Sequence, residues 1–367
     1  MRIALVVPGG VDRSGEYRVI PALLALISRL SRHHDLQVFA LRQEDRACSW
    51  DLAGAHVHNI GLPWPYPRAV RAIYATARSA RFDLVHAIWS GSCGLVAVAA
   101  ARMLGIPNLI HIAGGELVAL PEIGYGGRLK WYGRAREALV LRAASAITAA
   151  SAPTLQMLRG LGFAARRVPL GVDLDTWPPR APVRRPPGGP ARLIHLASLN
   201  RVKDQATLLR ALAALVTSGL DFEMDIVGED TLKGEMQALA AQLGLSARVR
   251  FQGFLTQRRL RPLVEAAHLL IISSRHETGP LAVLEAAVAG VPTVGTAVGH
   301  IAEWAPQAAL SVPVGDSAAL AVSIGTLLAD EELRLRIARE ALQRATREDA
   351  DYTAARMQEL YAELTAR

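Results

Sequence analysis

The chain has 367 residues, of which 51% are hydrophobic and 20% charged, and its formal net charge is +8 at pH 7. A chain of this length usually forms more than one hydrophobic core, and this composition excludes a disordered protein. The basic residues are nearly all arginine, because only Lys130, Lys203 and Lys233 are lysines. An arginine excess suits phosphate groups on nucleotides, nucleic acid or anionic lipid, and genomic base composition explains it equally well.

The cysteines and the apolar stretches of the sequence indicate in which cellular compartment the protein is expected. The two cysteines, Cys48 and Cys93, have no metal-binding or redox spacing, which favours a reducing cytosol over a disulfide scaffold. The N-terminal apolar run is too short for a signal peptide, and the longest apolar stretch, residues 94–101, is far shorter than a membrane span. We expect a cytoplasmic protein, and peripheral attachment to the inner face of a membrane stays open.

Short apolar runs alternate with helical patterns in the first half of the chain. Continuous apolar runs are typical of parallel strands covered on both faces. The segment 17–34 instead has apolar residues at helical spacing and basic residues on its other side. This alternation predicts an open, doubly wound sheet. The predicted strands are 3–7, 36–41, 84–88, 108–113 and 146–150.

The alternation stops at residues 177–190 and then restarts. Six prolines and two glycines there can continue neither a helix nor a central strand, so we expect an interdomain linker. We therefore expect two α/β domains, residues 1–176 and 191–345, with a ligand cleft between them, and an amphipathic helix at 346–367 that packs back on the first domain. Later strands are predicted at 192–198, 222–228, 248–253, 268–274 and 291–296, with helices at 204–217, 232–243, 257–267 and 281–290.

Two carboxylates stand eight positions apart in the stretch HETGPLAVLE, residues 276–285. Pro280 suits the first turn of a helix and Gly290 the position just past its end. The free N–H groups of a helix that starts at the carboxyl end of a strand bind phosphate. Glu277 and Glu285 would not help to hold phosphate, but a carboxylate can accept two hydrogen bonds from a vicinal diol. The combination favours a nucleotide-sugar as the ligand.

With its flanks, this segment (residues 273–303) resembles the E-x7-E signature of retaining glycosyltransferases of the GT-B fold, family four. The resemblance covers nearly the whole chain and implies two Rossmann-like doubly wound domains facing each other across a cleft. The first would bind the acceptor and the second the nucleotide-sugar. The other segments that agree in order and spacing are 112–117, 168–177, 196–212 and 226–254.

The resemblance also implies roles for individual residues. Lys203, helped by Arg201, would bind the donor diphosphate, and with Glu277 these two form the expected catalytic set. Glu277 would hold the sugar hydroxyls and Glu285 the ribose hydroxyls. The backbone after Glu277 would cradle sugar and phosphate, the pair at 253–254 would lie against the base, and the glycines at 9–10 would let the backbone approach the diphosphate. The expected donor-site residues are Gly9, Gly10, Ser198, Arg201, Lys203, Gly253, Phe254, Glu277, Gly279, Pro280, Leu281 and Glu285.

The sequence departs from the family pattern at three positions. Ser198 stands where many relatives have an arginine, Pro280 stands where relatives often have a glycine, and Ala113 stands where many relatives have a histidine near the anomeric centre. His111 lies two residues away from Ala113, but a lone strand histidine is more often packed in a core. The expected acceptor-side residues are His111, Gly114, Gly115 and Glu116.

No metal and no other cofactor is expected. The Asp173–Asp175 motif falls in a loop whose aspartates are structural in the family, so basic side chains and a helix end would stabilise the leaving group. The implied activity moves a sugar from a UDP- or GDP-sugar to a hydroxyl of a sugar, lipid-linked or small-molecule acceptor, with retention of configuration. The product would be a glycolipid, a polysaccharide or another glycoconjugate.

Two other function classes compete with this one. A nicotinamide-dependent oxidoreductase requires G-x-G-x-x-G after the first strand, and residues 8–17, PGGVDRSGEY, do not match. A non-catalytic lipid- or nucleic-acid-binding protein is suggested by the basic and aromatic segments 63–81 and 125–144. These segments are either solvated arginine-rich helix faces or a patch that faces an anionic membrane. Nucleic acid is not an expected partner.

Overall fold

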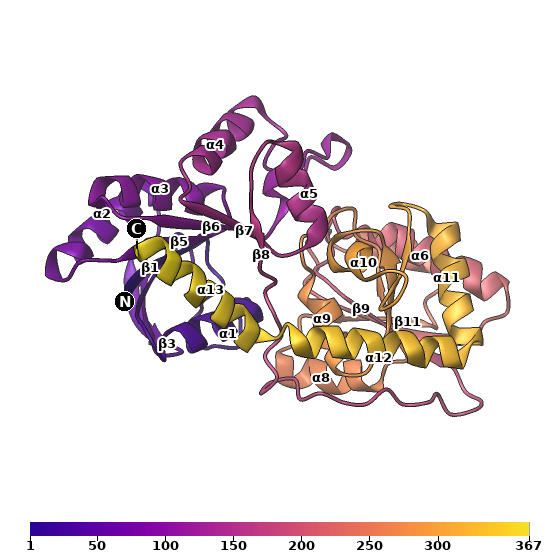
Figure 1. The fold of residues 1–367 in the computed structure, drawn as a ribbon. Coiled ribbons are helices and arrows are strands. Elements are labelled where there is room, and N and C mark those ends of the chain that lie inside the picture. The colour runs from indigo at the N-terminus through magenta and orange to yellow at the C-terminus, as the bar shows by residue number, and fades with distance from the viewer. Residues whose placement is uncertain (367) are drawn as a thin grey trace. The chain divides into compact units, whose positions relative to one another are not determined.

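The structure, a computed structural model, describes residues 1–366. The chain divides into two units: the first unit contains residues 1–173 and 349–367, and the second unit contains residues 174–348. Each unit has its own, almost entirely parallel sheet covered by helices (Figure 1). Two doubly wound α/β units are the predicted fold class, which is confirmed.

The sheet of the first unit has the order β3-β4-β2-β1-β5-β6-β7-β8, and only β3 runs antiparallel to its neighbour. All five strands predicted in this half are confirmed. The sequence CSWDL of β3 and AHVHN of β4 contain polar residues, so neither forms the continuous apolar run on which the prediction relied. The strands are β1 (Arg2–Val7), β2 (Asp35–Ala40), β3 (Cys48–Leu52), β4 (Ala55–Asn59), β5 (Leu84–Ile88), β6 (Asn108–Ile112), β7 (Ala146–Ala149) and β8 (Arg166–Arg167).

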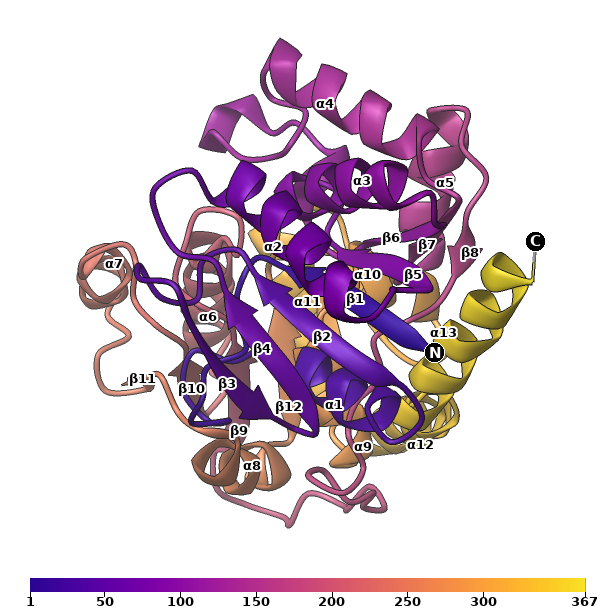
Figure 2. The same cartoon turned by 90° about the vertical axis from the view of Figure 1, so that its left-hand side faces the viewer.

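Helices cover both faces of this sheet, because alternate residues of β1 enter two different cores. Ala4 and Val6 pack with α2, α3, α4 and α5, while Ile3 and Leu5 pack with α1 and α13. Figure 2 shows α2, α3 and α4 side by side in one layer. The helices are α1 (Pro21–Leu30), α2 (Pro65–Ser79), α3 (Ser92–Leu104), α4 (Trp131–Arg142), α5 (Ala152–Gly160) and α13 (Ala350–Thr365), with short 3-10 turns η1 (Gly115–Leu117) and η2 (Pro121–Ile123).

The C-terminal helix α13 belongs to the first unit, where it packs on α1. The buried Tyr361 hydroxyl lies 2.7 Å from Nδ1 of His86 on β5. Arg29 on α1, only 6% exposed, forms ion pairs with Asp173 at 2.8 Å and with Asp351 at 2.7 Å. The two chain segments of the unit are therefore joined by a paired charge cluster and by a shared apolar core.

The sheet of the second unit has the order β11-β10-β9-β12-β13-β14 and is parallel throughout. The order reverses between β9 and β12, which is where sheets of this kind bind ligands. The five predicted strands and four predicted helices are all present. The elements are β9 (Ala191–Leu196), α6 (Gln205–Thr217), β10 (Phe222–Val227), α7 (Glu235–Gln242), β11 (Val249–Gly253), α8 (Gln257–Ala266), β12 (Leu269–Ile272), α9 (Leu281–Val288), β13 (Thr293–Thr296), α10 (Gly299–Trp304), β14 (Leu310–Val312), α11 (Ser317–Ala329) and α12 (Glu331–Arg347).

The proline-rich segment 177–190, expected as a linker, lies within the second unit. Its backbone is held there, since Arg180 N donates to Val288 O at 2.8 Å and Arg334 donates to Val183 O at 2.6 Å. Arg185 N donates to the carboxylate of Glu331 at 2.8 Å. Prolines exclude regular structure from this segment but do not prevent it from packing against α9 and α12. The chain passes between the units at 173–174 and 348–349 instead.

Candidate active site

Two loops meet at the carboxyl edge of the second sheet, where the strand order reverses. One follows β9 (residues 197–204) and the other follows β12 (residues 273–280). Ser273 Oγ donates to Lys203 O at 2.8 Å, and Arg275 N donates to Val202 O at 2.7 Å. Thr296 Oγ1, at the end of β13, donates to Ser274 O at 2.6 Å. Three neighbouring strand ends thus hold one another in a fixed arrangement.

Lys203 and Glu277 form an ion pair across these loops. Lys203 Nζ lies 2.6 Å from Glu277 Oε1, and the side chains are 24% and 12% exposed. Ser274 Oγ donates to the same carboxylate oxygen at 2.7 Å. The two residues therefore lie together, although 74 positions separate them in the sequence. A half-buried pair of this kind can exchange partners when an anion or a hydroxyl arrives, because each charge keeps access to solvent.

The turn before α6 holds Lys203 where its side chain can reach Glu277. Asp204 has a φ of +47° and caps α6 by accepting from Thr207 N at 3.4 Å, and it also accepts from Thr207 Oγ1 at 3.0 Å. Asp204 also forms an ion pair with Arg275, whose Nε lies 3.1 Å from Asp204 Oδ2. Lys203 N in turn donates to Asn200 Oδ1 at 3.1 Å. These contacts fix both ends of the lysine backbone, which positions its side chain before any ligand binds.

Glu285 lies one turn inside α9 and is only 4% exposed. Gln257 Nε2 donates to Glu285 Oε1 at 2.9 Å, and Trp177 Nε1 donates to Gln257 Oε1 at 2.7 Å. Burial raises the pKa of the Glu285 carboxyl to about 7, and the hydrogen bond from Gln257 opposes this rise. Sequence reasoning missed Gln257, although a polar residue opening a helix after a predicted strand was a usable signal.

The other expected donor-site residues of this unit are more exposed. Arg201 is turned toward α7, with its guanidinium 3.2 Å from Glu235, and does not contact Lys203 or Glu277. Ser198 is exposed after β9, Gly253 ends β11 with a φ of +66°, and Phe254 is 53% exposed.

The start of α9 is packed closely against α10. Gly279, Pro280 and Leu281 lead into α9, with Pro280 at its N-cap. Gly299, with a φ of +50°, leaves room where a Cβ would lie 3.2 Å from Glu277 O and 3.0 Å from the Pro280 ring. A larger residue at 299 would push on the loop that carries Glu277.

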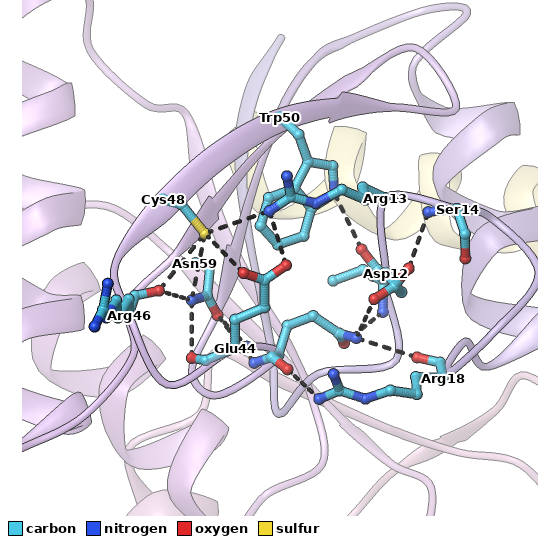
Figure 3. A network of polar contacts seen from close by, with 11 residues as sticks. Asp12, Arg13, Ser14, Arg18, Glu44, Arg46, Cys48, Trp50 and Asn59 are labelled. Carbon is cyan, nitrogen blue, oxygen red and sulfur yellow. Dashed lines mark hydrogen bonds and ion pairs between the residues drawn. The ribbon is translucent and has the colours of Figure 1, made fainter.

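The glycines after β1 in the first unit are tied to the loop after β2. Gly10 N and Val11 N both donate to Gln43 Oε1, at 2.7 and 3.1 Å. A Cβ on Gly9 would lie 3.2 Å from that same oxygen. The N–H of Gly10, expected to approach a diphosphate, is thus used within the unit. Figure 3 shows this network of polar contacts, which also includes Asp12. No pattern in the sequence predicted the network.

The expected acceptor-side residues have two kinds of environment. His111 is fully buried, its Nδ1 lies 2.9 Å from Thr148 Oγ1, and burial lowers its pKa to about 3, so it is a neutral core residue. Glu116 accepts from Gly114 N at 2.6 Å and from Ser90 N at 3.1 Å. Partial burial raises the Glu116 pKa, against these backbone donors. Gly115 O accepts from the loop that follows, at Gly127 N.

A second buried carboxylate, Glu137 on α4, was missed by sequence reasoning. It is 3% exposed, and neither of its oxygens accepts a hydrogen bond from the described residues. Its Oε1 lies 3.8 Å from an Arg128 nitrogen, and burial raises its pKa to about 7. The helical spacing of WYGRAREALVLR places Glu137 on the same face as Gly133 and Val140, which was the available signal.

No group of three or more His, Cys, Asp or Glu residues within 1–366 could hold a metal ion. Asp173, in the motif that superficially resembles a metal site, pairs with Arg29.

Two family models match the sequence. Residues 181–344 match Glycosyl transferases group 1, and residues 19–171 match the Glycosyl transferase 4-like domain. Glycogen synthase from Mycobacterium tuberculosis is 31% identical over 278 residues, which are 74% of this chain and 66% of that protein. The match thus spans just under two thirds of that relative's length.

Two solved structures share the fold. Sucrose-phosphate synthase from Thermosynechococcus elongatus superimposes with a TM-score of 0.84 at 19% identity, and the match covers 100% of both chains. Anabaena HepE in complex with UDP-glucose gives 0.76 at 20% identity, covering 99% of this chain and 100% of that one. These similarities confirm the fold predicted from the sequence.

Proposed function

The chain belongs to the glycosyltransferases, and from this premise we propose that it transfers a sugar from a nucleotide-sugar to an acceptor hydroxyl with retention of configuration. The observation that carries the proposal is the Lys203–Glu277 pair at the point where the second sheet reverses its strand order. A cation and a carboxylate 2.6 Å apart supply one group for the diphosphate and one for the sugar hydroxyls.

In this mechanism the nucleotide-sugar separates the Lys203–Glu277 ion pair and gives each side chain a new partner. Lys203 leaves Glu277 for a diphosphate oxygen and stabilises the charge that develops on the leaving group. Glu277 then accepts hydrogen bonds from the sugar hydroxyls and stays oriented by Ser274. The N–H groups at the start of α9 add donors for phosphate, and Glu285 accepts from the ribose diol. Lys203 and Glu277 are the catalytic residues of the proposal, with Arg201 joining them once it releases Glu235.

The donor is a UDP- or GDP-sugar, and the acceptor is a sugar, a lipid-linked sugar or a small molecule bound by the first unit. HepE, which shares the fold, is solved with UDP-glucose, which supports a UDP-sugar. Family four, a cytoplasmic location and a role in glycolipid, polysaccharide or glycoconjugate synthesis complete the proposal. Basic side chains replace a metal at the leaving group, so no metal or other cofactor takes part.

Incubation with a panel of UDP- and GDP-sugars, each together with a mixture of sugar acceptors, followed by detection of the released nucleoside diphosphate, tests this function. We expect release from at least one sugar nucleotide, and the same rate in excess EDTA, because the described residues offer no metal-ligand cluster. Turnover that EDTA abolishes and a divalent ion restores would show the metal-free mechanism to be wrong. Binding of a nicotinamide cofactor with no response to any sugar nucleotide would favour the oxidoreductase.

A further inference from the structure

The layer formed by α2 and α3 in the first unit is almost free of negative charge. Between Asp51 and Glu116 the sequence contains one acidic residue, Asp83, and it accepts a hydrogen bond from Arg2 N at 2.7 Å. The same stretch contains five arginines. With five arginines and a single acidic residue in this stretch, the surface of this layer is strongly cationic. The five arginines are Arg68, Arg71, Arg78, Arg81 and Arg102.

The outer face of α2 combines these arginines with aromatic side chains. Arg71 and Arg78 lie on the exposed face of the helix together with Tyr74, while Ile73 faces the core. Trp64, at the N-cap of α2, is 76% exposed, and Tyr74 is 45% exposed. Trp64 thus keeps most of its surface, and Tyr74 nearly half of its surface, available to a partner outside the unit.

A shallow pocket of about 210 Å³ opens between the carboxyl-terminal ends of α2 and α3. Arg78, Arg81 and Tyr74 line it together with the apolar side chains of Phe82, Leu104 and Ile106. Met103, also on its wall, is 57% exposed. The pocket therefore has two guanidinium groups and an apolar lining of aliphatic and aromatic side chains, which suit a ligand with an anionic end and an apolar body.

The arginines of this face also lack partners. Arg71, Arg78, Arg81 and Arg102 form no ion pair or hydrogen bond with any residue within 1–366, although Arg250 on β11 pairs with Glu223 and Asp225. None of the helices within 1–366 has the length and apolar character of a membrane span.

We propose that this face docks on the surface of an anionic bilayer, with a lipid phosphate held between Arg78 and Arg81. Arginine binds phosphate oxygens in a bidentate manner, and Trp64 and Tyr74 have the amphipathic side chains that concentrate at membrane interfaces. Leu104 and Ile106, together with the exposed Met103, give the pocket an aliphatic wall that suits part of an acyl chain. This inference does not depend on the identity of the sugar donor.

Co-sedimentation with vesicles of phosphatidylcholine alone and with added phosphatidylglycerol tests the proposal. We expect binding only to the anionic vesicles, weakening as salt is raised. Replacing both pocket arginines (Arg78→Gln, Arg81→Gln) should lower the partition coefficient about 30-fold, since each basic residue near such a surface contributes roughly fivefold. Trp fluorescence should shift to the blue on binding, and this shift should be smaller in Trp64→Phe.

The matched control is Arg336→Gln with Arg339→Gln, which removes the same charge from the exposed side of α12 in the second unit. An equal loss of binding in this control, or equal binding to neutral vesicles, would overturn the proposal. Tighter binding of a single-stranded oligonucleotide than of anionic vesicles would also overturn it, in favour of nucleic acid. Inorganic phosphate at millimolar concentration should not displace the vesicles, because displacement would assign the pocket to a free anion. Nucleoside diphosphate binding, unchanged in all variants, confirms that the variants are folded.

Discussion

Replacing Glu285 by glutamine is expected to stabilise the second unit by about 3 kcal/mol at pH 8 and to change its stability little at pH 4. Burial raises the pKa of this carboxyl from 4.5 to about 7. Between pH 4.5 and about pH 7 the folded state therefore keeps a proton on Glu285 that the unfolded state has lost. The free energy of unfolding of the wild type falls as the pH rises through this window. Glutamine resembles the protonated side chain and carries no such penalty.

Urea or thermal denaturation of the two proteins from pH 4 to pH 8 measures this difference. For a unit of this size the expected gain corresponds to a melting temperature higher by about 6–12 °C at pH 8. The same variant should bind nucleoside diphosphate less tightly, because its amide offers the ribose diol one uncharged acceptor oxygen instead of the two oxygens of a carboxylate. A stability difference that does not change with pH would contradict the buried, proton-holding environment of Glu285.

The second large effect concerns the Lys203–Glu277 pair. Lys203→Ala should weaken nucleoside diphosphate binding by about one to two orders of magnitude, since a charge-assisted hydrogen bond contributes roughly 1.5–3 kcal/mol. Glu277→Gln should behave differently. It releases Lys203 from a partner 2.6 Å away, so the free nucleotide should bind as well as in the wild type or more tightly. The intact nucleotide-sugar should turn over poorly, because the acceptor for its hydroxyls is lost.

Calorimetry of both variants with nucleoside diphosphate, and turnover with the nucleotide-sugar, separates these roles. Arg210→Ala is the control, because Arg210 is an exposed cation on α6, the helix that follows Lys203. It should leave both measurements unchanged. Equal losses of nucleotide affinity in Lys203→Ala and Glu277→Gln would show that the pair is a structural unit and would contradict the assigned division of roles.

The periodicity of the sequence was sufficient to predict most of the fold. Continuous apolar runs such as those of β1 and β12 occur because helices cover both faces of a parallel strand. The segments β3 and β4 lack such runs, and the prediction missed them for that reason. Prolines in 177–190 correctly excluded helix and strand. They carried no information about packing, which depends on distant contacts such as that between Arg185 and Glu331.

The site could be predicted only in part, because several of its side chains contact residues that are far away in the sequence. The E-x7-E spacing pointed to Glu277 and Glu285, and the strand-end position pointed to Lys203. The hydrogen-bond donor to Glu285 is Gln257, and no local pattern relates these two residues to each other. Similarly, Arg201 has a nearby acidic partner in Glu235 that only the fold reveals.

The central claim is that the loops carrying Lys203 and Glu277 bind a nucleotide-sugar, and calorimetric titration of UDP- and GDP-sugars tests it most directly. The wild type should bind at least one of them with a stoichiometry of one per chain. The double variant Lys203→Ala, Glu277→Gln should lose that binding while keeping the circular dichroism spectrum of the wild type. Absence of binding by every sugar nucleotide, or undiminished binding by the folded double variant, would contradict the claim.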